Sequence, residues 1–114
     1  MGRKAQKNDS LPGSLDMLIL RTLSLRDLHG YGIVQFIQQS SGNELLIEEG
    51  SLYPALHKLE NEGWIKAEWK PTENNRRAKF YALTRAGRRH LDKETANWDR
   101  LSAAISQVVR IEEA

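Results

Sequence analysis

Apolar residues recur at helical spacing in four stretches of the chain, and strict alternation replaces that spacing between the third and the fourth. The first stretch predicts a helix within residues 11–28, where Ser14 after a Pro-Gly pair provides the cap. A second helix is expected over about residues 31–41, after a break at His29–Gly32. A third should run from residues 49–51 to Gly63.

The third of these helices combines a narrow apolar stripe with a polar opposite face. Leu52, Ala55, Leu56 and Leu59 follow the i, i+3, i+4, i+7 spacing of one helical face. The other face carries hydrogen-bonding and cationic groups, at Ser51, Tyr53, His57, Lys58 and Asn61. A helix of this kind suits the major groove of DNA, and an ordinary amphipathic surface helix is the alternative on this stretch alone.

After Gly63 the period changes to that of a strand. Ile65, Ala67 and Trp69 alternate with charged residues, which predicts a half-buried strand with these three on its buried face. A turn-rich segment over residues 71–78 leads to a second strand over residues 79–83, so the two form a hairpin. The short apolar run at residues 45–47 predicts one further brief strand.

Thr84 caps a final helix that should extend to about Ile111. Its apolar positions form a heptad-like stripe, interrupted by Glu94, and we expect the first helix and a second copy of the protein to cover it. The first helix is also apolar on a second side. We therefore expect a two-fold homodimer whose interface contains Leu15, Met17, Leu20, Leu91, Trp98, Leu101, Ile105 and Val108.

Composition and charge narrow the function. The 114 residues suit one domain, and the absence of cysteine excludes disulfides, thiolate catalysis and cysteine-based zinc sites. The net charge is only +2, but seven basic residues against the single acid Glu73 lie between residues 70 and 89, at Lys70, Arg76, Arg77, Lys79, Arg85, Arg88 and Arg89. One basic zone on a nearly neutral protein indicates a polyanionic partner.

Residues 1–10 add further cations, and we expect them to form a disordered basic arm. No segment has the length or apolarity of a signal peptide or a membrane span, so a soluble cytoplasmic protein is expected. The three histidines lack the spacing of metal ligands, and neither a phosphate-binding loop nor a nucleophile elbow is present. We therefore expect no metal, no cofactor and no enzymatic activity.

Three helices and a basic hairpin together predict a winged helix-turn-helix, in a chain that is mainly α with a small β-hairpin. Residues 11–84 should form this DNA-binding domain and residues 85–114 a long C-terminal dimerisation helix. In this arrangement the third helix enters the major groove and the hairpin, or wing, brings Arg76, Arg77 and Lys79 to the phosphates or the minor groove.

Four motifs in this order and spacing resemble the PadR-type transcriptional regulators: LPGSLDMLILRTL, LHGYGI, GSLYPALHKLENEGWI and ENNRRAKFYALTRAGRRHL. The single long C-terminal helix is similar to the short-tailed branch of that family. The resemblance implies a homodimeric repressor on an inverted-repeat operator in double-stranded DNA. It assigns Ser51, Tyr53, Pro54, His57 and Lys58 to the recognition helix, and Asn75, Arg76, Arg77 and Lys79 to the wing.

Two alternatives remain at this level. Some short-tailed regulators hold a small planar aromatic effector between two tryptophans of the C-terminal helices, and Trp98 is the candidate residue here. Packing of the dimer seam is the favoured role for this tryptophan. The other alternative is a protein-interaction module that uses the same fold without sequence-specific DNA binding, for which the basic wing would be dispensable.

Overall fold

The computed structural model describes residues 14–113, which form four α-helices and three β-strands. The elements are α1 (Ser14–Leu25), β1 (Leu28–His29), α2 (Gly30–Ser40), α3 (Glu49–Asn61), β2 (Ile65–Pro71), β3 (Arg77–Leu83) and α4 (Arg85–Val109). The predicted fold class, mainly helical with a small hairpin and a long C-terminal helix, is confirmed. The basic arm expected over residues 1–10 lies outside the described residues.

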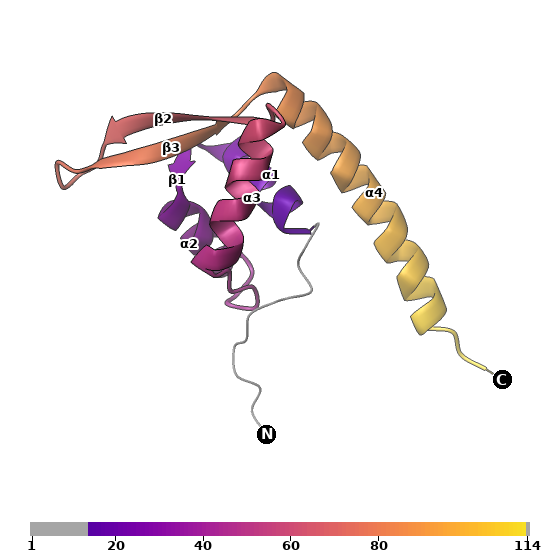
Figure 1. Ribbon diagram of the computed structural model, residues 1–114. Helices are drawn as coiled ribbons and strands as arrows, with labels where there is room; N and C mark the ends of the chain where they lie inside the picture. The colour runs from indigo at the N-terminus through magenta and orange to yellow at the C-terminus, as the bar shows by residue number, and fades with distance from the viewer. Residues whose placement is uncertain (1–13, 114) are drawn as a thin grey trace.

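The core lies between α1, α2 and α3 and one face of the sheet (Figure 1). It contains Leu15, Ile19, Leu20, Leu23, Ile33, Ile37, Leu52, Leu56, Leu59, Ile65, Tyr81 and Leu91. The apolar stripe predicted for the third helix is the one that α3 buries. Each of these large side chains stabilises the fold by about 1.5–3 kcal/mol relative to an exposed position. Together they fix the orientation of α3.

The sheet has three strands rather than the two of the predicted hairpin, in the order β1-β3-β2. In β1, Leu28 pairs with Tyr81 and His29 with Phe80, both antiparallel. Two residues are too few to show an alternation, so sequence pattern alone missed this strand. β1 ties the start of α2 to the wing.

The prediction of a brief strand at residues 45–47 is wrong, because this segment is irregular coil. Leu45 and Ile47 pack against the core in that conformation. The backbone N–H of Leu45 donates to Oγ of Ser41 at 3.0 Å. A side chain therefore provides the partner that a neighbouring strand would otherwise supply.

The wing, β2 with β3, extends well beyond the helices (Figure 1). β3 begins at Arg77, two residues before the predicted position 79. Ile65 and Tyr81 are buried near the base of the wing, but Trp69 is 57% exposed. The prediction of a buried Trp69 is wrong because alternation identifies a face and cannot tell how far the helices below it reach.

The first turns of α4 pack against α1 and against Trp64, the residue before β2, and the helix then projects away from the domain (Figure 1). The Thr84 hydroxyl accepts from the N–H of Gly87 at 3.0 Å and donates to the carbonyl of Gly63 at 2.7 Å. One turn later, the His90 ring stacks on Trp64 with 3.5 Å between ring centroids. A Cβ at Gly87 would collide with the carbonyl oxygen of Trp64.

Gly87→Ala should lower the free energy of unfolding by at least about 2 kcal/mol, because backbone atoms at this contact cannot move aside as a flexible side chain would. Gly50→Ala is the matched control, since no atom lies within 4 Å of a Cβ built on this residue of α3. We expect it to be neutral or to stabilise by up to about 1 kcal/mol. Urea unfolding of both variants at one protein concentration measures the difference, and equal midpoints would contradict the proposed close contact.

Candidate nucleic-acid interface

The exposed face of α3 carries all five residues that the resemblance assigned to the recognition helix. Burial of the leucine stripe turns this face outward, so Ser51, Tyr53, Pro54, His57 and Lys58 are all exposed. The helix begins at Glu49, which places Pro54 in the second turn. The N–H that proline lacks would have bonded the carbonyl of Gly50, and that residue is exposed to water.

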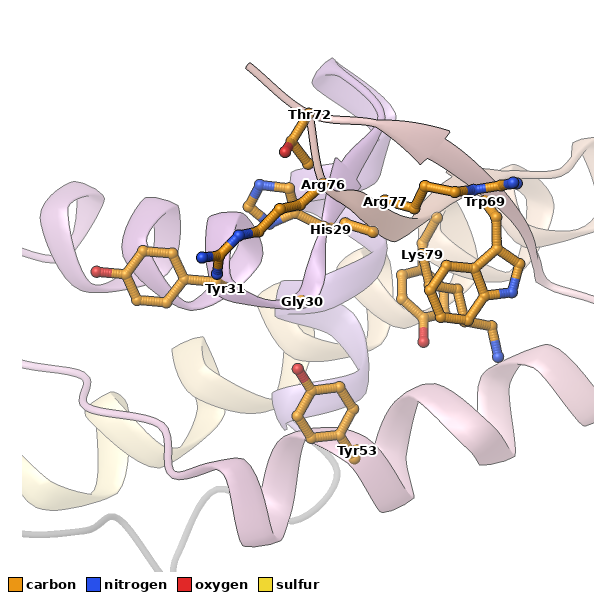
Figure 2. Close-up of a pocket in the computed structure, with 11 residues that line it drawn as sticks. His29, Gly30, Tyr31, Tyr53, Trp69, Thr72, Arg76, Arg77 and Lys79 are labelled. Atoms are coloured by element: carbon orange, nitrogen blue, oxygen red, sulfur yellow. The ribbon is translucent and has the colours of Figure 1, made fainter. Parts of the chain in front are cut away.

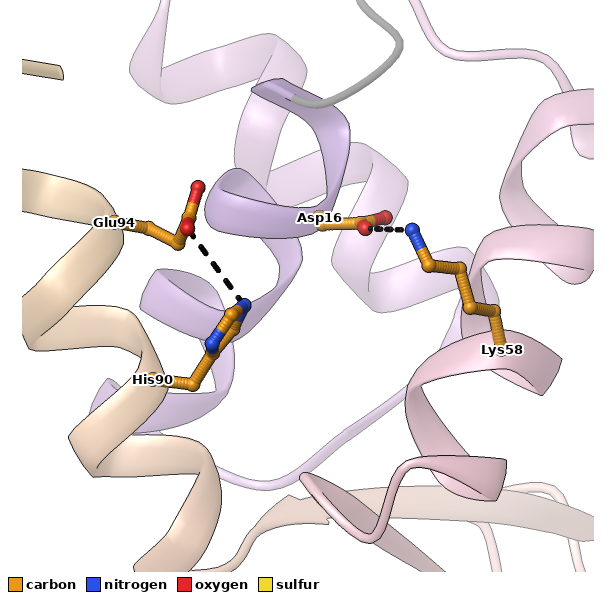
Figure 3. A network of polar contacts seen from close by, with 4 residues as sticks. All are labelled: Asp16, Lys58, His90 and Glu94. Atoms are coloured by element: carbon orange, nitrogen blue, oxygen red, sulfur yellow. Dashed lines mark hydrogen bonds and ion pairs between the residues drawn. The ribbon is translucent and has the colours of Figure 1, made fainter. Parts of the chain in front are cut away.

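Lys58 is drawn toward α1 by an ion pair. Its Nζ lies 2.7 Å from a carboxylate oxygen of Asp16, as Figure 3 shows. The hydrogen bond and charge of Asp16 raise the pKa of Lys58 above its usual value. The Lys58 side chain remains 59% exposed, so solvent weakens the pair. Part of the positive charge predicted for the recognition face is therefore compensated within the chain.

The cations of the wing also differ in whether a carboxylate lies close to them. Lys79 lies 3.5 Å from a carboxylate oxygen of Glu60 on α3 and 5.7 Å from the centroid of the Tyr81 ring. Arg76 and Arg77 are exposed, next to the turn where Asn75 adopts a positive φ of 62°. Arg76 and Arg77 at the tip, with Lys66 near the base, are thus the cations of the wing that are exposed to solvent.

A groove of about 570 Å³ separates α3 and the start of α2 from the wing. Figure 2 shows Tyr53 on α3 below it, Tyr31 on α2 at one side, and Arg76 and Arg77 on the wing above. Trp69 stands at the opposite end from Tyr31. Three aromatic and two guanidinium side chains, from α2, α3 and the wing, therefore surround one opening.

Sequence reasoning missed Tyr31, His29 and Trp69 as residues of this site. The HGYG segment was interpreted only as a break between helices, although its histidine caps α2 by accepting from the N–H of Gly32 at 3.0 Å. The same ring packs edge-on against Phe80, 5.1 Å between centroids. An exposed aromatic residue directly after such a break was the available signal.

The residues expected at a dimer interface fall into two groups. Leu15, Leu20 and Leu91 are at most 7% exposed and belong to the core of the chain itself, and Met17 is partly buried against it. Trp98, Leu101, Ile105 and Val108 form an exposed stripe on α4, which Val109 extends. Among these residues the candidates for contact with a second copy are therefore the α4 stripe and the partly buried Met17.

Two further findings concern residues 14–113. No group of three or more histidine, aspartate or glutamate side chains in this range could hold a metal ion. No helix in it is long and apolar enough to cross a bilayer.

Comparison with known proteins relates this geometry to a family. The model of the transcriptional regulator PadR-like family matches residues 19–93, which cover α2, α3 and the wing. A transcriptional regulator from Clostridium thermocellum superposes with a TM-score of 0.82, at 28% identity over 90% of this chain and 100% of that one.

Two more solved structures are similar to the chain. A PadR family transcriptional regulator from Eggerthella lenta has a TM-score of 0.76 and 28% identity, over 88% of this chain and 85% of that one. A protein of Streptococcus mutans has a TM-score of 0.77 and 34% identity, over 90% of this chain and 93% of that one.

Replacement of Asp16 by Asn should lower the free energy of unfolding by less than about 1 kcal/mol near neutral pH, because the pair with Lys58 is screened by solvent. Pairing raises the lysine pKa in the folded state. The contribution is therefore complete below the ordinary lysine pKa and is lost as pH rises through the raised value.

Urea unfolding of the wild type and Asp16→Asn at about pH 7 and about pH 11 tests this pH dependence. The difference between the two proteins should shrink at the higher pH. Lys58→Met is the control, since Asp16→Asn should have less effect in that background. An equal difference in all three comparisons would show that Asp16 acts without Lys58.

Proposed function

Because the chain belongs to the PadR-like family of transcriptional regulators, we propose that it is a repressor that binds an inverted-repeat operator as a homodimer. The family is one of DNA-binding regulators, so the chain is a regulator rather than an enzyme. The observation that carries the finer proposal is the exposed polar face of α3, which lies across an open groove from the guanidinium groups of Arg76 and Arg77.

The exposed face of α3 has the chemistry for reading base edges. The major groove is about 12 Å wide and admits one α-helix. Ser51 can donate to or accept from base edges, the His57 imidazole can do the same, and the Pro54 ring is apolar enough for a thymine methyl group. These three would discriminate the operator, whereas Lys58 contributes charge that Asp16 partly offsets.

The wing supplies affinity that does not depend on sequence. Each arginine that neutralises a phosphate releases a counterion. This adds about 0.9 to the steepness with which the logarithm of the binding constant falls against the logarithm of the salt concentration, the salt slope. Arg76 and Arg77 are exposed for such contacts, and the guanidinium group can hold a phosphate with two parallel hydrogen bonds. Asn75 shapes the turn that carries them.

The α4 stripe supports the homodimer. Trp98, Leu101 and Ile105 are 48%, 51% and 54% exposed, and the described chain places no element over them. A contiguous apolar stripe of this kind is typical of an association surface. A second copy related by a two-fold axis can cover it with the same stripe, and the same symmetry would present two α3 helices to an inverted repeat.

Trp98 takes a packing role in this proposal. Its position at the start of the exposed stripe would place it in the dimer seam, where an indole ring buries a large apolar area. Sensing of a small aromatic effector there would require the ring to face that of a second copy. The regulator would act on chromosomal DNA in the cytoplasm.

Arg76→Glu with Arg77→Glu should abolish detectable DNA binding, because two phosphate contacts become two repulsions. The measurement is fluorescence anisotropy with a duplex that the wild-type protein selects from a randomised library. Lys93→Glu with Arg100→Glu is the matched control, since it imposes the same charge change on two exposed cations of α4 that lie outside the groove and outside the basic zone of residues 70–89.

Unchanged affinity of the Arg76 and Arg77 variant would favour the alternative of a protein-interaction module, for which the basic wing is dispensable. An equal loss in both double variants would assign the effect to overall charge rather than to the wing.

Trp98→Ala with Leu101→Ala should lower the mass measured by sedimentation from two chains toward one, because both side chains leave the α4 stripe. Arg100→Ala with Gln107→Ala is the control on the opposite side of the same helix. A dimer that survives the first pair of substitutions would locate the seam elsewhere.

A further inference from the structure

The exposed aromatic and large aliphatic side chains of residues 14–113 divide almost completely between two surfaces. The first is the α4 stripe, continued by the residues that follow it. The second consists of Tyr31, Tyr53 and Trp69, which are 65%, 48% and 57% exposed and all line the groove between α3 and the wing. Exposure of three aromatic rings around one opening is the pattern of a binding surface. The α4 stripe has a proposed partner, and the groove has none assigned.

The geometry of duplex DNA specifies what such a groove must hold. The sugar-phosphate backbone of one strand is the wall between a major groove and the adjacent minor groove. A protein with a helix in the major groove and a wing at the minor groove therefore straddles that backbone. In this chain the space between α3 and the wing is the aromatic groove.

Resting on the function proposed above, we propose that the groove holds the backbone of one DNA strand. In this arrangement Tyr31 and Tyr53 donate hydrogen bonds to phosphate oxygens, and Trp69 packs against deoxyribose. Arg76, which lines the same groove, neutralises the phosphate that the two hydroxyls bind. Tyrosine hydroxyls are ordinary phosphate ligands in protein–DNA interfaces.

The resemblance placed Tyr53 on the recognition helix, and the orientation of its ring favours contact with the backbone over contact with a base. Its hydroxyl oxygen lies against Gly30, where an added Cβ would be only 2.8 Å away. The ring therefore points from α3 toward the start of α2, across the groove, and Gly30 provides the room for it. Ser51, Pro54 and His57 are left as the residues of α3 that face the bases.

Hydroxyl deletion distinguishes backbone contact from base reading. Tyr31→Phe and Tyr53→Phe should each weaken binding about tenfold, because each loses one hydrogen bond to a charged group. The loss should be equal for the library-selected duplex and for a scrambled duplex of the same length. The salt slope should stay constant, since a neutral hydroxyl releases no counterion.

Three further variants calibrate the measurement. Arg76→Gln should lower the salt slope by about 0.9. Trp69→Leu should behave as the tyrosine variants do, with loss of affinity at constant slope. Ser106→Ala, which removes an exposed hydroxyl on α4 far from the groove, should bind as the wild type does. Thermal unfolding of each variant verifies that the fold is intact.

Each remaining outcome overturns part of the proposal. If Tyr53→Phe changes the preference at one base pair, this residue reads a base and not the backbone. If both tyrosine variants bind as tightly as the wild type, the backbone contact is wrong while the proposed function stands. If the wild-type protein selects no duplex from the library, the proposed function fails and the inference fails with it.

Discussion

Burial of the leucine stripe of α3 is the constraint on which the rest of the interface depends. Leu52, Leu56 and Leu59 are each at most 1% exposed, packed against α1, α2 and the base of the sheet. A helix held along one full side has no freedom to rotate about its own axis without opening cavities in the core. The residues between these leucines are therefore directed outward as a set. The core packing therefore orients a rather polar helix, and base recognition in the proposed function would follow from it.

Periodicity predicted the elements that are long enough to repeat a pattern. Three features could be predicted from the sequence: the stripe of α3, the alternation of β2 and the cap at Thr84. Each repeats a local physical rule several times or places a characteristic residue at a boundary. β1 could not be predicted, because its two residues form a strand only through their pairing with β3. Residues 45–47 were misassigned for the opposite reason, since an apolar run packs equally well as coil when a side chain satisfies its backbone.

The sequence predicted which residues make up the candidate site, but not which of its cations pair with carboxylates and which stay exposed. Charge counting treats Lys58, Lys79, Arg76 and Arg77 as equivalent cations. The fold brings carboxylates from α1 and α3 to the two lysines and leaves the two arginines exposed. Contacts between residues 42 positions apart, as for Lys58 and Asp16, have no local signal in the sequence. The result is a surface on which fixed charge pairs stabilise the domain and planar guanidinium groups remain for phosphate.

The close contact of Gly87 with the carbonyl of Trp64 fixes the direction in which α4 leaves the domain. The 25 residues of α4 span roughly 37 Å, so a tilt of about 5° at the Gly87 contact would displace the far end by about 3 Å. That displacement is close to the rise of one base pair along a DNA strand, about 3.4 Å. In a dimer joined through α4, the accuracy of one glycine contact would thus set the phase between two half-sites. Gly87, which contacts no DNA in this arrangement, would then determine the operator spacing that the dimer accepts.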